Sequence, residues 1–591
     1  MMQFVAANMA PIMFAGLVFF LLLGFPVAFS LAACGLFFGV IGIELGLLHE
    51  TLFQALPLRL FGIMQNDTLL AVPFFTFMGL ILERSGMAED LLDTVGQLFG
   101  PVRGGLAFAV VFVGAMLAAT TGVVAASVIS MGLISLPIML RYGYDRKVAT
   151  GVIAASGTLA QIIPPSLVLI IMADQLGRSV GDMYRGAFIP GFILTGLYAS
   201  YIVLVTMVKP QWAPALPPEA RTIREDDGSS GLKSLGALVV LAAAVAYGFE
   251  YWYTGHYPEA STEEIVVLGL MAAIGAAFVL SLINKALRLN LLSRIAERTT
   301  FVLIPPLALI FLVLGTIFIG VATPTEGGAM GATGALVMAL ARRRLSWSLL
   351  KQAMDTTAKL STFVIFILIG STVFNLSFQG VDGAKWVEHL LSDLPGGQVG
   401  FLIVVNIMVF ILAFFLDFFE LAFIIVPLLG PVAEKLGIDL IWFGVLLAVN
   451  MQTSFMHPPF GFALFYLRSV AAREDYVDTL TGRTIAKVTT GQIYWGAVPF
   501  VGIQLIMVAL VIFFPQMVIG DIEKRKKIDI DSIKIEIPTD TQYKTIDPMK
   551  GMARPQGAEK PPADKGGSGQ APAEEDPMKA ILRSLESEPK K

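Results

Sequence analysis

Apolar windows of membrane-spanning length recur along the chain from residue 11 to residue 516. Each window runs for about 20 residues with almost no charge, the length that a helix needs to cross ~30 Å of hydrocarbon. Short polar or glycine-rich stretches separate the windows. The pattern predicts an all-α polytopic membrane protein.

Composition agrees with this prediction and excludes an ordinary soluble domain. Of the 591 residues, 56% are hydrophobic and 15% are charged. No basic segment precedes the first apolar run and no small-residue cleavage site follows it, so we expect a first span and not a removed signal peptide. The single cysteine, Cys34, excludes an intrachain disulfide. Residues 520–591 lose the apolar pattern, and we expect a flexible tail there.

The chain repeats itself at a shift of 294 residues. "LPIMLRYGYD" (136–145) matches "GPVAEKLGID" (430–439), with proline, glycine and aspartate at the same places. The same shift carries Pro164-Pro165 onto Pro458-Pro459. Because the register holds over some thirty residues, we interpret the two halves as internal repeats.

The repeats cover about 10–210 and 300–516. A connector, 211–299, separates them and contains an extra apolar pair at about 235–249 and 264–283. Each repeat contains one segment of hairpin length, 104–140 in the first and 399–434 in the second, with a polar or small-residue interruption in its middle.

Lysine and arginine fall into two unequal groups of loops. The larger group includes Arg141, Arg146, Lys147 and the run Arg342–Arg344, whereas the smaller one consists of Arg59, Arg178, Arg185, Lys385 and Lys435. Since positive loops stay in the cytoplasm, the first hairpin starts and ends inside and the second starts and ends outside. This predicts an inverted-topology repeat with two re-entrant hairpins, a transporter architecture. The same alternation places the tail in the periplasm, although the tail begins "EKRKK".

Two apolar segments, 148–173 and 441–468, contain the proline pairs and are predicted to be broken helices. Proline in a helix interior removes a donor and clashes with the preceding turn, at a cost of ~3 kcal/mol. Freed carbonyls suit a cation, and a helix N-terminus suits an anion. A simple proline kink is the alternative, which the recurrence of the pair makes the minority interpretation.

The polar residues near these breaks and hairpin turns are candidate ligands. In the second hairpin, Asp417 and Glu420 are carboxylates within a membrane segment, a costly placement that favours function; mere solvation in an aqueous vestibule is the alternative. Ordinary small-residue helix packing is the alternative for the first turn. The candidate ligands for a coupling cation, Na⁺ or H⁺, are Thr120, Thr121, Gly122, Ser127, Ser156, Gly157, Thr158, Pro164, Asp417, Glu420, Asn450, Gln452, Thr453 and Pro458. The substrate-binding candidates are Ser127, Pro165, Ser166, Ser454, His457 and Pro459.

Two further residues have more local interpretations. His457 could hydrogen-bond a backbone carbonyl, contact substrate or titrate near neutral pH. Glu326 follows a proline at a predicted helix start, and we interpret it as a capping residue. The four histidines lack metal spacing and no phosphate-binding glycine loop is present. We therefore expect neither an enzyme nor a cofactor other than Na⁺ as coupling ion.

The sequence resembles the large membrane subunit of TRAP (tripartite ATP-independent periplasmic) transporters over nearly all of residues 10–516. The resemblance rests on "GFPVAFSL", "LLAVPFFTFMGLILERSG", "GYDRKVATGVIAASGTLAQIIPPS", "GVATPTEGGA" and "LGIDLIWFGVLLAVNMQTSFMHPPFGFALF". It implies an elevator-type, Na⁺-coupled importer of an organic acid in a bacterial inner membrane. The implied partners are a small membrane subunit and a periplasmic substrate-binding protein. It also implies ion sites where each hairpin turn meets its broken helix. "SFMHPP" and the long connector depart from the usual pattern.

Three alternatives to this hypothesis stay open. The first is a stand-alone carboxylate carrier of a related inverted-hairpin fold, and the second is a channel. The third is a membrane enzyme, which is the least favoured because no nucleophile can be paired with a base. No lysine or arginine lies in either broken-helix core. A carboxylate cargo would therefore be held by helix ends, hydroxyls and amides.

Overall fold

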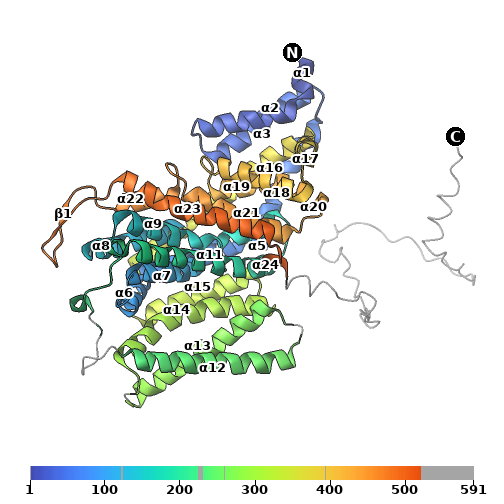
Figure 1. The fold of residues 1–591 in the computed structure, drawn as a ribbon. Helices are drawn as coiled ribbons and strands as arrows, with labels where there is room; N and C mark the ends of the chain where they lie inside the picture. Colours follow the sequence, from blue (N-terminus) through green and yellow to red (C-terminus); the bar gives the residue numbers. More distant parts are fainter. Residues whose placement is uncertain are drawn as a thin grey trace, which may run out of the picture. The chain divides into compact units, whose positions relative to one another are not determined.

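The computed structural model describes residues 2–121, 124–221, 223, 231–258, 260–289, 291–392 and 394–520, with only the backbone at 2, 22, 118–121 and 263. The predicted tail therefore lies outside the described residues. Eight helices in the described part are long and apolar enough to cross a membrane, or up to ten if two bent helix pairs count as one span each. The helices of Figure 1 establish the predicted helical membrane fold.

The first repeat opens with seven short or membrane-length elements before its hairpin. These are α1 (Met2–Ala7), α2 (Met9–Leu22), α3 (Val27–Glu44), η1 (Glu50–Ala55), α4 (Leu56–Met64), α5 (Asp67–Arg84) and α6 (Met87–Phe99). The hairpin, broken helix and last span follow as α7 (Gly105–Thr121), α8 (Val124–Arg141), α9 (Arg146–Thr158), η2 (Leu159–Gln161), α10 (Leu167–Gln175) and α11 (Val180–Val208).

The connector and the second repeat continue the same order. The connector contains η3 (Pro210–Trp212), η4 (Pro218–Ala220), α12 (Leu232–His256) and α13 (Thr262–Ala286). The next helices are α14 (Arg294–Phe318), α15 (Pro324–Ala341), α16 (Trp347–Gly380) and α17 (Gly383–Ser392). The second hairpin and broken helix are α18 (Gly397–Leu412), α19 (Phe418–Ile424), α20 (Val426–Lys435), α21 (Leu440–Met451), η5 (Gln452–Phe455) and α22 (Phe462–Val470). The chain ends with the two-residue antiparallel strands β1 (Tyr476–Val477) and β2 (Thr484–Ile485), then α23 (Thr490–Phe513) and α24 (Gln516–Ile519).

The residues that match in sequence also have matching local structure. Gly143 and Gly437 end their helices with φ of +86° and +74°, a conformation that glycine adopts without a steric penalty. Two residues later Asp145 caps α9, accepting bonds from the amides of positions 147 and 148 at 2.8 and 3.3 Å. Asp439 caps α21 in the same way, at 2.8 and 3.0 Å. The shift of 294 residues therefore preserves backbone geometry as well as residue type.

The two ends of each hairpin segment also meet. The Leu106 amide at the start of α7 donates to the Tyr144 hydroxyl beyond the end of α8, at 3.2 Å. In the second repeat Gln398 Nε2 donates to the Leu436 carbonyl at 2.8 Å. A segment that enters and leaves the membrane on one side requires such a closure.

The two repeats exchange packing partners. Helix α3 packs against α16, and α15 packs against α5. Backbones touch in the first pair, because a Cβ on Gly35 would lie 2.7 Å from the Val373 carbonyl oxygen and one on Gly370 would lie 2.4 Å from that of Ala28. Small residues allow this approach in lipid. Each repeat thus completes its core with a helix of the other.

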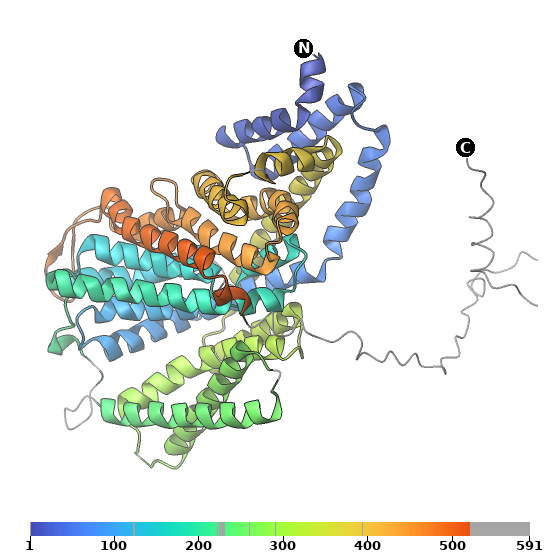
Figure 2. The same ribbon diagram turned by 45° about the vertical axis from the view of Figure 1, so that its right-hand side comes forward.

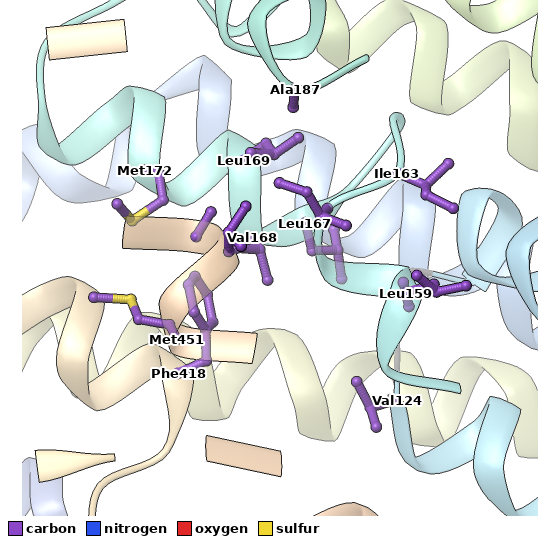
Figure 3. Packing of buried hydrophobic residues seen from close by; sticks show 14 of the residues in the cluster. Val124, Leu159, Ile163, Leu167, Val168, Leu169, Met172, Ala187, Phe418 and Met451 are labelled. Atoms are coloured by element: carbon purple, nitrogen blue, oxygen red, sulfur yellow. The ribbon is translucent and has the colours of Figure 1, made fainter. Parts of the chain in front are cut away.

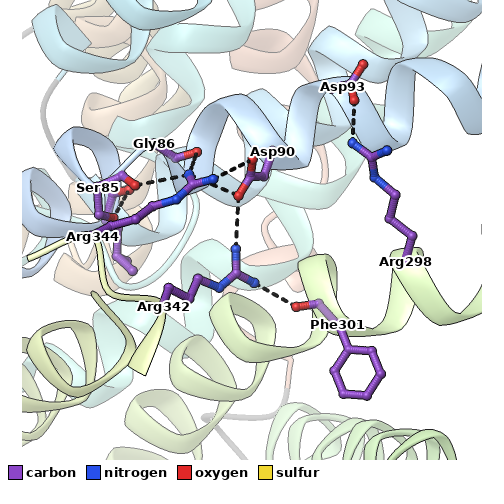
Figure 4. Close-up of polar contacts among 9 residues, drawn as sticks. Ser85, Gly86, Asp90, Asp93, Arg298, Phe301, Arg342 and Arg344 are labelled. Atoms are coloured by element: carbon purple, nitrogen blue, oxygen red, sulfur yellow. Dashed lines mark hydrogen bonds and ion pairs between the residues drawn. The ribbon is translucent and has the colours of Figure 1, made fainter. Parts of the chain in front are cut away.

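Arginines from α14 and from the loop that follows α15 form ion pairs with the amphipathic helix α6 (Figure 4). Arg342 and Arg344 both pair with Asp90, at 3.2 and 3.0 Å, and Arg298 pairs with Asp93 at 2.6 Å. Ion pairs in the described part join loops predicted to lie on the same side of the membrane, which agrees with the predicted orientation.

The connector adds two long helices at the place of the extra apolar pair. Figures 1 and 2 show α12 and α13 side by side, with α13 against α14. The pair lies on the far side of α14 from the broken helices, so it widens the molecule without entering the region of the proline pairs.

We expect the matching caps to stabilise both repeats alike. Asp145→Ala and Asp439→Ala should each lower the free energy of unfolding by about 1 kcal/mol, because each leaves two helix amides without their acceptor. Asp145→Asn and Asp439→Asn retain an acceptor oxygen and should lose much less. Thermal unfolding in detergent measures this, and equal losses for alanine and asparagine would contradict the capping role.

Candidate functional site

Both predicted broken helices are interrupted at their proline pairs. The first has irregular backbone from Ile162 to Ser166, between η2 and α10, and the second from Met456 to Gly461, between η5 and α22. The Pro164–Pro165 and Pro458–Pro459 peptide bonds are both cis. The Ser166 hydroxyl donates to the Gln161 carbonyl at 2.6 Å and accepts from the Val168 amide at 3.2 Å. Ser166 therefore joins the two halves of the first broken helix.

Equivalent residues of the two repeats meet next to the breaks. Gln452 Nε2 donates to Thr158 Oγ1 at 3.1 Å, and the two positions are separated by 294 residues, the shift of the repeat. Both side chains are fully buried. Since a residue and its symmetry mate touch only at a two-fold axis, this contact marks the internal symmetry axis of the two repeats.

Polar atoms near both breaks are buried without a hydrogen-bond partner in the described part of the chain. Asn450 uses its amide nitrogen on the Asn406 carbonyl and side-chain oxygens, at 2.8 and 3.0 Å, which leaves its own Oδ1 free. The other free oxygens are Oγ of Ser156, Oε1 of Gln161, Oε1 of Gln452 and Oγ of Ser454. Each such atom costs about 1–3 kcal/mol unless something binds it. Both ring nitrogens of His457, beside the second proline pair, are also in this set. The oxygens are of the ligand type that hard cations take.

The tip of the second hairpin is a reciprocal capping box. Asp417 Oδ1 accepts from the Glu420 amide and Glu420 Oε2 accepts from the Asp417 amide, both at 2.9 Å. The two carboxylates therefore have a structural role in starting α19. The box uses one oxygen of each carboxylate.

A cavity of about 320 Å³ lies where this hairpin tip faces the first repeat. Asp417 and Glu420 line it together with Gln161. Val124 and Ala125 contribute from the start of α8, and the remaining wall comes from α5, α10, α16, η5 and α22. Figure 3 shows Val124, Leu159, Leu167, Phe418 and Met451 in the buried apolar cluster that surrounds this region. Parts of both hairpins and both broken helices thus converge around one enclosed space.

The remaining candidates lie elsewhere. Gly122 lies outside the described residues, and of Thr120 and Thr121 only the backbone is described. Ser127 is buried on α8. His457 lies between Phe410 and Phe414, with ring centroids 4.3 and 4.2 Å away. The lining residues of the cavity do not include Ser127, Pro165, Ser166, Ser454, His457 or Pro459.

The structure confirms one prediction and adds residues that the sequence did not indicate. Glu326 forms a capping box with Thr323 at the start of α15, as expected. The cavity also contains Thr76 of α5, which is 1% exposed and whose hydroxyl has no partner in the described part. Its only sequence signal is a lone hydroxyl in the apolar run "VPFFTFMG". Phe363 and Tyr466 also line the cavity, and nothing in the sequence distinguishes them from aromatic residues of the core.

We expect Thr158 and Gln452 to be energetically coupled. Thr158→Val and Gln452→Leu each break the same bond, so the double variant should be less destabilised than the sum, by about 1 kcal/mol. Thr150→Val, on the same helix but bonded to the Arg146 carbonyl, serves as the control. It should combine additively with Gln452→Leu in thermal unfolding. Additivity of the Thr158 pair as well would contradict the coupling.

Comparison with known proteins gives a consistent family. Residues 14–517 match the family described as "Tripartite ATP-independent periplasmic transporter, DctM component". The C4-dicarboxylate TRAP transporter large permease protein DctM of Pseudomonas aeruginosa is 26% identical, covering 78% of this chain and 88% of that protein. The ectoine TRAP transporter large permease protein TeaC of Halomonas elongata is also 26% identical, covering 86% and 98%. The Alcanivorax borkumensis YdaH transporter structure is 17% identical, covers 79% of this chain and 90% of its own, and has a TM-score of 0.43. This chain belongs to the DctM family, the large membrane permease subunits of TRAP transporters.

Proposed function

We propose that this chain is the membrane-translocating subunit of a Na⁺-coupled secondary importer for a small organic acid. Family membership supports transport by a multi-span permease of a bacterial inner membrane. The assignment of Na⁺ as the coupling ion rests on the buried oxygens that have no hydrogen-bond partner in the described part beside both proline breaks. The proposed partners are a small membrane subunit and a periplasmic substrate-binding protein, as the family implies.

The proposed Na⁺ ligands lie around the two breaks. Ser156 and Asn450 occupy equivalent positions in the repeats, and each carries a free oxygen. Carbonyl groups released where η2 and η5 end are further ligands of the kind that a cation prefers. Two sites related by the internal axis would follow from this symmetry, and binding that favours the cargo-competent state gives the coupling.

The cargo assignment is limited to chemical class. Two relatives are named for different cargoes, C4-dicarboxylate and ectoine, so family membership leaves the compound open. We assign the cavity at the second hairpin tip as the cargo site, because parts of both repeats enclose it. The N-terminus of α10, where the Ser166 side chain already caps the Val168 amide, lies beside it as an anion-favouring helix end.

The transport movement that we propose is of the elevator type. The moving group contains the hairpins, the broken helices, α11 and α23, and the frame contains α2–α6 and α14–α17. Polar bonds that join the two groups in the described part include Asn66 Nδ2 to Asp174 Oδ1 at 2.6 Å and Ser371 Oγ to the Phe423 carbonyl at 2.7 Å. Ser130 Oγ also donates to Glu83 Oε1 at 2.8 Å, Arg185 donates to the Phe318 carbonyl, and Lys435 pairs with Glu388. Most of the remaining contact is apolar packing, which tolerates sliding because it has no fixed direction.

Uptake by the reconstituted transporter tests this function. Proteoliposomes that contain the chain with its small subunit, supplied with the binding protein, should accumulate a carboxylate cargo only with an inward Na⁺ gradient. Ser156→Ala and Asn450→Ala should each raise the Na⁺ concentration for half-maximal uptake by about tenfold, because each removes a proposed ligand.

Ser281→Ala is the matched control, since Ser281 is also a buried hydroxyl without a partner in the described part but lies on α13 of the connector. It should leave the Na⁺ dependence unchanged. Uptake by the chain alone would support the stand-alone carrier instead, and single-channel currents would support the channel. Uptake that ignores Na⁺ would refute the coupling.

A further inference from the structure

A separate cavity of about 260 Å³ lies at the base of the first hairpin and shares no lining residue with the cavity at the second hairpin tip. Its walls are α6 on one side and the two ends of the hairpin, in α7 and α8, on the other. Segment 213–221 and the turn between β1 and β2 contribute the remainder. Arg103, Arg141, Arg221 and Arg483 lie in the surrounding loops, so the cavity is on the predicted cytoplasmic side.

Polar bonds hold segment 213–221 against the end of α6. The Leu216 amide donates to the Gly100 carbonyl at 2.9 Å, and Gln97 Nε2 donates to the Ala220 carbonyl at 3.1 Å. The segment therefore closes the cavity as a fixed wall, and the space is not a gap between loosely packed loops.

Most of the lining of this cavity is apolar. Each of the elements around it contributes to the apolar part, which includes Leu92, Leu106, Ile138, Leu216, Ala220 and Leu480. Such a lining favours an occupant with an apolar body, because burial removes apolar surface from water.

The described wall also contains one charge of each sign, Asp93 and Arg141. Both side chains are accessible, at 46% and 17% exposure. Asp93 binds Arg298 through Oδ2 at 2.6 Å, which leaves its Oδ1 outside that pair. Arg141 binds Asp478 through Nε and one Nη, both at 2.8 Å, which leaves the other Nη outside that pair. An occupant that carries both an anionic and a cationic group matches this arrangement.

The short hairpin of β1 and β2 indicates that hydrocarbon is near the cavity. Val477 on β1 is 62% exposed, and Leu480 in the turn, which lines the cavity, is 76% exposed. Exposed apolar side chains on neighbouring positions are typical of a segment that contacts a membrane surface. They favour a cavity that opens where head groups meet hydrocarbon.

We propose that this cavity binds a phospholipid with an ethanolamine head group from the cytoplasmic leaflet. One acyl chain lies between α6 and the hairpin, the phosphate binds Arg141, and the primary ammonium donates to Asp93. Phosphatidylglycerol has the phosphate but no ammonium. Phosphatidylcholine has a cation without an N–H, so it cannot make the charge-assisted hydrogen bond to Asp93.

Lipid capture from nanodiscs of known composition tests the site. The full-length chain is placed in equal amounts of phosphatidylethanolamine, phosphatidylcholine and phosphatidylglycerol with the same acyl chains, without Na⁺ or cargo. Native mass spectrometry after extraction into mild detergent then counts the lipids that stay bound. Phosphatidylethanolamine should be retained about tenfold over either competitor, the factor that one hydrogen bond to a charged group supplies. Equal retention of all three, or preferential retention of phosphatidylglycerol, would overturn the inference.

Two aspartates of α6 form a matched pair for the head-group contact. Asp93→Asn should abolish the preference for phosphatidylethanolamine, because an amide oxygen attracts an ammonium less than a carboxylate does. Asp90→Asn is the control, since Asp90 also pairs with arginines but does not line the cavity. It should keep the preference. Equal losses in the two variants would show that the anchoring of α6, and not a contact with the head group, determines retention, and would overturn the inference.

A second pair of variants tests the apolar part. Ala220→Phe places a ring in the cavity wall and should lower retention of phosphatidylethanolamine about tenfold. Ala215→Phe is the control, because Ala215 is also half-buried in segment 213–221 but does not line the cavity. Glycerophosphoethanolamine, which has the head group without acyl chains, should not displace the lipid at equal concentration. Displacement by this soluble compound would show a site for a free head group and would overturn the inference.

The result of lipid capture is independent of the proposed transport function. Equal retention of the three lipids together with Na⁺-driven uptake would refute the lipid site and keep the importer. Selective capture that is lost in Asp93→Asn, together with uptake that ignores Na⁺, would keep the lipid site and refute the coupling.

Discussion

The structure depends on one constraint, the cost of leaving backbone and side-chain polar groups unpaired at membrane depth. Hydrocarbon cannot satisfy the groups that the proline pairs release, so irregular backbone survives there only when protein or a water-filled cavity lines it. Here the first break is covered by protein, whereas Pro459 and Phe460 of the second break are exposed. Every residue from Val148 to Met172 is buried, and the hairpin α7–α8 packs against α9. The hairpins and flanking spans thus form the enclosure that allows a helix to end in the membrane interior.

Internal symmetry repeats the broken helix and joins the two copies. The bond between Thr158 and Gln452 lies on the axis, and α3 and α15 each pack against a helix of the other repeat. Because each repeat packs its membrane-length helices against the other, neither half has a complete core alone. The backbone contacts at Gly35 and Gly370 show how closely the frame is packed. Few directional bonds, by contrast, join the frame to the broken helices in the described part. This difference in directional bonding agrees with the sliding movement that we propose.

Sequence reasoning found the features that repeat or follow a period. The spans, the proline breaks, the Asp145 and Asp439 caps and the capping role of Glu326 all leave local signals, because backbone geometry dictates those residue types. The cavity left no such signal. Thr76 is one hydroxyl in an apolar run, and only tertiary packing brings it to the hairpin tip beside Gln161. Asp417 and Glu420 stand out in the sequence for their charge, and their spacing of three residues is also that of a capping box. The predicted substrate contacts at His457 and Ser454 lie next to a proline pair in sequence but do not line this cavity, and they stay predictions.

The capping box gives the two cavity carboxylates a double role that links binding to structure. Each carboxylate accepts a backbone amide at the N-terminus of α19, where the helix dipole favours negative charge. The same charges therefore both start the helix and set the potential of the cavity. A change in the box alters where α19 begins. Under the proposed function, a ligand that binds these carboxylates is therefore linked to the geometry of the hairpin tip. Such coupling between an occupied site and the conformation around it is what secondary transport requires, because an importer that moves equally well empty or half-loaded dissipates its gradient.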